Sequence, residues 1–315
     1  MQQLPEGVTV VNDDASADRA LQVLLSLPIE APVAWDTEVA DIDVKTQSPV
    51  GNGRVICATA FAGDHVDFGN GPRLWVDNDG AAEGVLDRFK SYFEDPSRGK
   101  AFHNFGFDRH VLFNHGIDVL GLSGDTMHMA RTWSSARSKQ GGYSLEALST
   151  DLLGHRKVPM KEKFKVHHIK RDGTEGKDSF VPPVHLLQRL PYWRSAWIDY
   201  ATYDAEATWR LREVLEAKLR QRPWARDLSL WDFYSTYVAP FAVVLTDMER
   251  AGIRVDVTEH LPRAQESATA EQKASEEQFM EWATSLCPAA ARMNAGSDPQ
   301  KAHFLFAPVR KLTKS

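Results

Sequence analysis

Three groups of polar residues in this chain have the types and spacings that metal-assisted hydrolysis requires. Asp36 and Glu38 lie two residues apart after an apolar run, Asp108 closes the segment that begins with Asn104, and Asp204 lies four residues after a tyrosine. Carboxylate oxygens are the hard ligands that Mg²⁺ prefers. Two such cations ~4 Å apart can serve both the attacking water and the leaving oxygen of a phosphodiester. If the carboxylates converge, the sequence therefore predicts phosphodiester hydrolysis.

Each group also has a simpler interpretation when it is taken alone. Asp36 and Glu38 project to one face of a strand, but two surface carboxylates would show the same pattern. Asp108, in the first turn of a helix, could merely complement the helix dipole. Tyr200 and Asp204 share a helix face, which could be solvent-exposed. However, Asp204 lies near the apolar side of that helix, where a carboxylate needs a partner.

Apolar periodicity and turn residues predict the elements that position these groups. We expect strands at Val33–Asp36, Arg54–Phe61, His65–Phe68 and Lys100–His103, the first three forming an antiparallel meander. We expect helices at 16–27, 83–93, Phe105–His115, Asp125–Trp133, Ser144–Leu153 and Trp193–Leu219. Asp125 is predicted to be an N-cap rather than a metal ligand. A meander followed by helix, strand and helix predicts an α/β fold, a ribonuclease H-like mixed sheet with flanking helices.

The remaining chain is predicted to be mainly helical. Leu228–Arg250 reads as a helix that is interrupted near Pro240, Ile253–Asp256 as a short strand, and 258–286 as a polar helix. The stretch His155–Asp172 has seven Lys and Arg residues against two acids and lacks clear periodicity. It predicts a solvated loop, or a basic arm over a nucleic-acid groove.

Composition limits the classes of protein that this chain can represent. Its 315 residues suit two domains, and 43 % apolar residues can form ordinary globular cores. The net charge of −6 is mildly adverse to phosphate binding. Two distant cysteines, Cys57 and Cys287, indicate free thiols rather than a disulfide framework. Without a stretch of roughly 20 apolar residues, we expect no membrane association and a cytoplasmic location.

Taken together, the three motifs resemble those of the DEDD exonucleases, in the subtype whose third motif carries a tyrosine. They occur in the expected order, and the flanks 103–109 and 200–211 match as well. The resemblance implies 3′→5′ exonuclease activity with two divalent ions, Mg²⁺ or Mn²⁺. Asp36, Glu38 and Asp204 would hold one ion, and Asp36 and Asp108 the other. Tyr200 would orient the attacking water.

The same resemblance implies residues that hold the substrate. They are Thr37, Ile42, His103, Asn104 and Phe107. Ile42 would pack against the terminal base, and Asn104 would hold either the strand or the motif itself.

The chain beyond residue 220 resembles the start of the polymerase region in family A DNA polymerases. The matching segments are 237–256, Asn294–Phe306 and Arg310–Ser315. We therefore expect an exonuclease domain at 1–220 and the base of a polymerase thumb at 221–315. The expected partners are 3′ ends of single-stranded DNA, and a polymerase region in the same gene or a separate chain.

Two other functions stay open at this point. An enzyme of the same fold could act on RNA 3′ ends, and a domain with a decayed site could be purely structural. The polymerase-like region favours DNA over RNA, and the complete set of four acids and the tyrosine favours an active enzyme.

No complete polymerase motif precedes Ser315. We therefore expect the purified 315-residue chain to extend no primer with dNTPs. Template-dependent extension in a primer-extension assay would contradict our interpretation of the region beyond residue 220.

Overall fold

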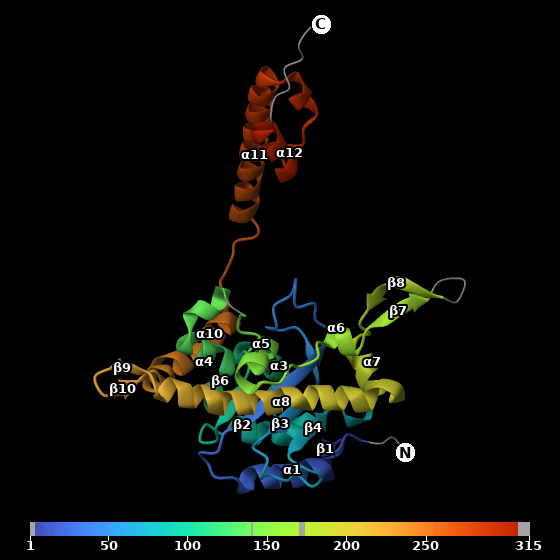
Figure 1. The fold of residues 1–315 in the computed structure, drawn as a ribbon, viewed down its shortest axis with the longest axis vertical. Coiled ribbons are helices and arrows are strands. Elements are labelled where there is room, and N and C mark those ends of the chain that lie inside the picture. Colours follow the sequence, from blue (N-terminus) through green and yellow to red (C-terminus); the bar gives the residue numbers. More distant parts are fainter. Residues whose placement is uncertain (1–3, 140, 170–173, 308–315) are drawn as a thin grey trace. The chain divides into compact units, whose positions relative to one another are not determined.

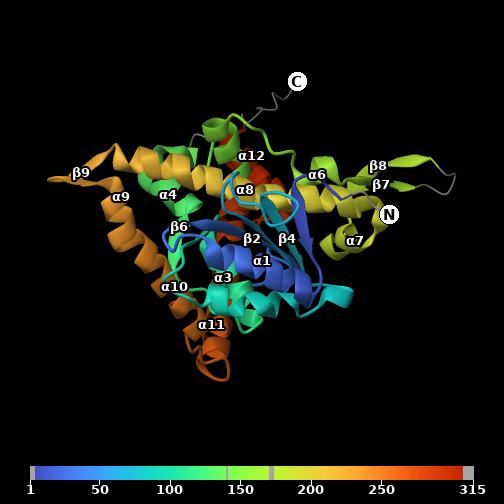
Figure 2. The same cartoon turned by 90° about the horizontal axis from the view of Figure 1, so that it is seen from below.

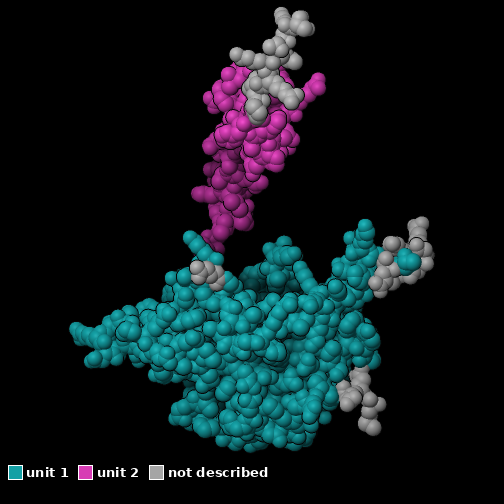
Figure 3. All heavy atoms as spheres, viewed as in Figure 1, with its two compact units in different colours: residues 1–251 teal, residues 252–315 magenta. Residues whose placement is uncertain are grey.

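The computed structural model describes residues 4–139, 141–169 and 174–307. Residues 170–172 of the basic stretch and the predicted polymerase-like segment Arg310–Ser315 lie outside these ranges. The chain divides into two compact units, residues 1–251 and 252–315 (Figure 3). Within the described ranges, no helix combines the length and the apolar character needed to cross a membrane.

A six-stranded mixed sheet forms the centre of the first unit (Figure 1). Its strands are β1 (Val8–Val11), β2 (Val33–Ala40), β3 (Arg54–Phe61), β4 (Arg73–Asp77), β5 (Lys100–Phe102) and β6 (Leu122–Asp125). The order is β1-β4-β3-β2-β5-β6; β3 is antiparallel to its neighbours β2 and β4, and the other pairs are parallel. The predicted ribonuclease H-like mixed sheet is thus confirmed.

The antiparallel meander is present, but its third strand is β4. The prediction of a strand at His65–Phe68 is wrong, because these residues lie in the turn region between β3 and β4. Gly63 has a positive φ of 111°, and the Asp67 carboxylate accepts hydrogen bonds from the amides of Gly69 and Gly71, both at 2.8 Å. A carboxylate that holds its own backbone in this way favours a turn over a strand.

Helices cover both faces of the sheet. They are α1 (Asp14–Ser26), α2 (Lys90–Phe93), α3 (Phe105–Asn114), α4 (Thr126–Trp133), α5 (Leu145–Leu148), α6 (Met160–Lys163), α7 (Val184–Arg189) and α8 (Pro191–Arg220). Short 3₁₀ turns lie at Gly80–Ala82, Val85–Phe89 and Ser135–Lys139, and a π turn at Ser149–Leu153. Figure 2 shows α1 and α8 on opposite sides of the sheet.

The two faces bury different apolar sets. On the side of α1, Trp35 of β2 packs against Phe93 with ring centroids 4.5 Å apart. On the other side, Ile198 and Ala201 of α8 pack in one buried cluster with Cys57 of β3. Alternate residues of β2 therefore face two cores, and its carboxylates at 36 and 38 lie on the side opposite to Trp35.

The basic stretch is more ordered than predicted. It contains α6, and its strand β7 (Val166–Ile169) forms an antiparallel hairpin with β8 (Glu175–Phe180) that extends away from the sheet (Figure 1). Phe164 anchors the segment because it is fully buried against Trp197 and Tyr200 of α8. One aromatic among many lysines gives no periodic signal, so the prediction of a loop was wrong here.

The first unit continues past residue 220. After a small ribbon of β9 (Pro223–Ala225) and β10 (Leu228–Ser229) come α9 (Leu230–Phe233), a π turn at Tyr234–Val238 and α10 (Ala239–Ala251). The α10 helix is fixed to α3 by an ion pair from Arg109 to Asp247, at 2.8 Å, and by a hydrogen bond between His110 Nε2 and Glu249, at 2.6 Å. The proposed domain division at 220/221 stays a prediction.

The second unit is helical. It contains α11 (His260–Leu286), a 3₁₀ turn at Pro288–Arg292 and α12 (Asp298–Phe306). The predicted strand Ile253–Asp256 is wrong, because these four residues pair with no strand among the described residues. Ile253 is 92 % exposed, so no partner strand covers the apolar residues on which the prediction rested.

Candidate active site

Three of the predicted carboxylates meet between β2 and α8. Asp36, Glu38 and Asp204 each offer an oxygen, and these oxygens all lie within 4.8 Å of one another. Strand alternation brings the first two to the face that α8 covers. Asp204 lies on the buried side of α8 and is 6 % exposed. We call these three residues the carboxylate cluster.

Asp108 is held beside the cluster by Thr37, the residue between its two strand members. One oxygen of Asp108 accepts hydrogen bonds from the Thr37 amide at 3.0 Å and from the Thr37 hydroxyl at 2.7 Å. The first turn of α3 is thereby tied to β2. All four predicted acids are therefore in one region, with Asp108 joined to the other three through Thr37.

Asp125 positions the segment that leads into α3. Its carboxylate caps α4 by accepting from the amides of Met127 and His128. It also accepts from the amides of Asn104, at 3.1 Å, and Phe105, at 3.0 Å. The prediction that Asp125 is an N-cap is thus confirmed. Its second role, in the loop before α3, was not predicted.

The predicted substrate residues surround these elements. Asn104 is exposed in the left-handed conformation, with φ of 70°, directly before α3. His103 Nδ1 lies 2.8 Å from the Thr126 hydroxyl, and burial lowers the pKa of His103 to about 4. Phe107 and Ile42 are half-buried. Their contact with a substrate strand stays a prediction.

Burial and mutual repulsion dominate the electrostatics of the site. Burial, followed by the charges of Asp204, Asp108 and Glu38, raises the pKa of Asp36 well above its ordinary value. Burial and the charge of Asp204 raise the pKa of Glu38 to about 8. For Asp108, burial outweighs the hydrogen bonds from Thr37 and raises the pKa to about 7. Without a cation the site therefore holds protons at neutral pH.

These shifts predict a pH dependence for the metal-free protein. A carboxyl whose pKa is raised by folding binds more protons in the folded than in the unfolded state, so stability falls as pH rises. For Glu38 and Asp108 this window runs from their ordinary values of 4.5 and 3.8 up to about 8 and 7. We expect the melting temperature in EDTA to fall across pH 5–8, and Mn²⁺ to raise it most at the alkaline end, because ligands must lose protons. A Mn²⁺ effect independent of pH would contradict this.

Sequence reasoning missed one residue of the site, Lys157. Its Nζ lies 2.5 Å from Asp204 Oδ2 and 4.0 Å from the centre of the Tyr200 ring. Burial alone would lower the pKa of Lys157, but Asp204 and Tyr200 raise it above its ordinary value, so this lysine is charged. Seven basic residues in one irregular stretch gave no signal that could single it out.

Lys157 places a positive charge on one oxygen of Asp204, Oδ2, beside the place where a cation would bind. We expect Lys157→Met to strengthen Mn²⁺ binding, because a cation then competes with no ammonium group for Asp204. Loss of one charge-assisted hydrogen bond of ~1.5 kcal/mol corresponds to about a tenfold gain. Calorimetric titration with Mn²⁺ measures it. The control Lys157→Arg retains the charge and should bind Mn²⁺ as the parent does. Weaker binding by Lys157→Met would show that the lysine supports metal binding instead.

The donor set fits a hard divalent cation. All ligand atoms of the carboxylate cluster are oxygens, which suit Mg²⁺ and Mn²⁺. Asp204 Oδ1 is buried and has no hydrogen-bond partner among the described residues, although a buried polar atom normally has one. A cation held by Asp36, Glu38 and Asp204 would supply that partner and offset the repulsion between the carboxylates.

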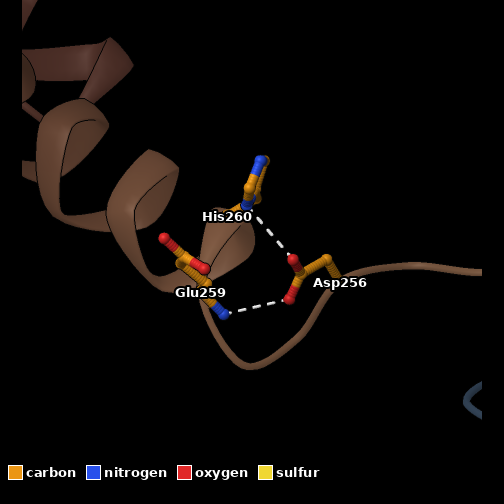
Figure 4. A group of neighbouring side chains, drawn as sticks. All are labelled: Asp256, Glu259 and His260. Atoms are coloured by element: carbon orange, nitrogen blue, oxygen red, sulfur yellow. Dashed lines mark hydrogen bonds and ion pairs between the residues drawn. The ribbon is translucent and has the colours of Figure 1, made fainter.

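A second group of possible ligands has a simpler explanation. Asp256, Glu259 and His260 lie together at the start of α11 (Figure 4). Asp256 accepts from the amide of Glu259 at 3.0 Å, and its other oxygen lies 3.1 Å from His260 Nδ1. Both oxygens are thus used in the turn before the helix, and all three residues are exposed. These contacts indicate that the group stabilises the start of α11, as capping residues do.

A ribonuclease H-like sheet with a cluster of converging carboxylates is suited to metal-assisted phosphodiester hydrolysis. Residues 8–220 match the 3′–5′ exonuclease family of family A DNA polymerases. The chain belongs to this family, as the 3′–5′ exonuclease domain of an enzyme similar to DNA polymerase I. Divalent metal ions are expected for this family, and the carboxylate cluster is suited to bind them.

The most similar relatives include DNA polymerase I A, chloroplastic/mitochondrial, of Arabidopsis thaliana. It is 42 % identical over 309 residues, which cover 89 % of this chain and 29 % of the relative. The chain therefore spans less than a third of the length of this relative. The cytoplasmic location stays a prediction.

Two solved structures share the fold at lower identity. The POL domain of Pol1 from M. smegmatis, in complex with DNA primer-template and dNTP, has a TM-score of 0.60 and 18 % identity over 95 % of this chain and 40 % of that chain. RNase D of Trypanosoma brucei has a TM-score of 0.53 and 15 % identity over 80 % of this chain and 77 % of that chain. At such identities these similarities concern the fold alone.

Proposed function

We propose that this chain removes nucleotides from the 3′ end of single-stranded DNA and proofreads for a DNA polymerase. The observation that carries the proposal is the convergence of Asp36, Glu38 and Asp204, with an unpartnered oxygen on Asp204. The choice of DNA is supported by the similarity to DNA polymerases over most of the chain. The polymerase region would lie in the same gene or on a separate chain.

We assign two divalent cations to the site, as the motifs imply. Asp36, Glu38 and Asp204 would hold one, and Asp36 and Asp108 the other. When bound, such cations favour hydroxide over water and offset the charge on the leaving 3′ oxygen. The protein positions their ligands: the β2–β3 pairing fixes Asp36 and Glu38, and Thr37 fixes Asp108.

Tyr200 and Lys157 supply the remaining chemistry at the site. Burial raises the pKa of Tyr200 above its ordinary value, so its hydroxyl keeps its proton and orients water by a hydrogen bond rather than acting as a base. Lys157 carries a positive charge next to Asp204, where it would contact a phosphate oxygen once a cation takes over the carboxylate. Asn104, His103, Phe107, Ile42 and Thr37 would line the strand.

An exoribonuclease is the second candidate, favoured by the fold shared with RNase D. The test is digestion of 5′-labelled single-stranded DNA and RNA of one sequence, side by side, with Mg²⁺ or with EDTA. We expect DNA to shorten stepwise from its 3′ end, faster than RNA, and only with Mg²⁺. Faster digestion of RNA would support the second candidate, and no digestion of either would support a structural domain.

A further inference from the structure

A cavity of about 700 Å³ lies next to the carboxylate cluster, within the first unit. It is lined by residues of α8 between Asp199 and Arg210, by residues between 153 and 163, and by Arg73 at the start of β4. Lys157 and Tyr200 line it, and both also belong to the active site. Its volume is in the range of small-molecule sites, roughly 300–1,000 Å³. We call it the α8 cavity.

The lining of the α8 cavity is cationic in a protein that is acidic overall. Five Lys and Arg side chains line it against two acids, Asp199 and Glu206. Lys157 is paired with Asp204, and Arg210 with Asp64 and Glu206. Asp199 is shared by Arg73 and Lys163, each at 3.1 Å. Among the described residues, Arg156 pairs only with Glu162, at 3.4 Å, where both side chains are more than half exposed, so that pair offsets little of its charge. The cavity thus offers positive charge to an anion.

Two flat rings lie beside these cations. Tyr203 of α8 and His155 both line the cavity, and their ring centroids are 4.9 Å apart. Aromatic rings next to Lys and Arg are the features with which proteins hold single-stranded nucleotides, the rings stacking on the base and the cations binding the phosphate. The combination therefore points to a ligand with both a base and a phosphate.

We propose that the α8 cavity binds a nucleotide through its phosphate, either one in the strand being degraded or the nucleoside monophosphate that hydrolysis releases. This inference rests on the proposed function. The chain has a net charge of −6, and the cations of the cavity would offset the repulsion between a bound phosphate and the nearby carboxylates. Lys157 both lines the cavity and contacts Asp204, so these charges interact within a Debye length of ~10 Å. Residues 155–163 of the basic stretch then contribute part of a binding site.

The test measures binding without hydrolysis. In EDTA, we compare the parent with Arg156→Gln/Lys163→Gln, which removes two charges from the cavity. The matched control is Lys161→Gln/Lys165→Gln, which removes two exposed charges of the same segment that do not line the cavity. The probes are a fluorescent single-stranded oligonucleotide, followed by anisotropy over a range of salt, and dAMP, followed by calorimetry. Melting temperatures check that each variant is folded.

We expect the cavity variant to bind at least one probe about five- to tenfold more weakly than the control variant does. Weaker oligonucleotide binding, with a salt slope reduced by ~0.7 per lost phosphate contact, assigns the cavity to the strand. Weaker dAMP binding alone assigns it to the released nucleotide. Equal binding by the two variants, or no binding of either probe by the parent, overturns the proposal.

The same experiment separates this proposal from the proposed function. If the parent protein binds a probe through the cavity but digests neither DNA nor RNA with Mg²⁺, the nucleotide site stands and the exonuclease assignment is wrong. If the parent protein digests DNA and the two variants bind the probes equally, the exonuclease assignment stands and the proposed nucleotide site is wrong.

Discussion

Asp36→Asn is expected to remove nearly all exonuclease activity. Asp36 is the carboxylate that the proposed mechanism shares between both cations, and an amide cannot replace its charge. Loss of a partner that only supports a metal ligand typically costs ~10–100-fold, so loss of this ligand should cost more. The measurement is single-turnover digestion of a labelled oligonucleotide at saturating Mg²⁺.

The same substitution should stabilise the metal-free protein. The pKa of Asp36 is well above its ordinary value because burial and three neighbouring carboxylates disfavour its charge, and asparagine has nearly the same shape without a charge. In EDTA at pH 8 we expect a higher melting temperature, by ~2–4 °C for each kcal/mol gained. A folded variant with parental activity would remove Asp36 from the site. A lower melting temperature would show that Asp36 is a structural residue.

Tyr200→Phe is expected to slow cleavage by up to ~100-fold, the lower end of what a positioned proton-handling group contributes. The substitution deletes one oxygen and retains the ring, which is 9 % exposed and packs edge-on against Phe164 with centroids 5.5 Å apart. Thermal stability and Mn²⁺ affinity should therefore change little. Single-turnover rates at saturating Mg²⁺ measure the effect.

Tyr192→Phe is the matched control for Tyr200→Phe. It removes a hydroxyl from a side chain that is 82 % exposed at the start of the same helix and does not line the α8 cavity, so it should cleave at the parental rate. If Tyr200→Phe were as neutral as Tyr192→Phe, Tyr200 would be a packing residue, and the four carboxylates would remain as the site.

The parts of the site that lie on regular elements could be predicted from the sequence. Strand alternation placed Asp36 and Glu38 on one face, and helical spacing placed Tyr200 and Asp204 on one side of α8, which the structure brings against β2. The first two strands of the meander were predictable because Val33–Trp35 and Arg54–Phe61 are apolar runs separated by glycine turns. These signals are local, and each depends on the residues of one element.

The parts that were missed depend on contacts between distant residues. Lys157 reaches Asp204 from an irregular segment 47 residues earlier, and no local pattern distinguishes it from its basic neighbours. The side chains of β7 and β8 that the structure describes are all exposed or half-buried, so no buried face gives these strands an apolar alternation that sequence reasoning could detect. Asp125 gave a local N-cap signal, but its bonds to Asn104 and Phe105 cross 20 residues or more.

The central claim is that the carboxylate cluster hydrolyses nucleic acid from the 3′ end with the help of divalent cations. The most direct measurement follows a 5′-labelled single-stranded DNA with the parent and with Asp204→Asn, each in Mg²⁺ and in EDTA. We predict a ladder that shortens from the 3′ end only for the parent in Mg²⁺. Digestion by Asp204→Asn at the parental rate, or release of the 5′ label as the first product, would contradict the account.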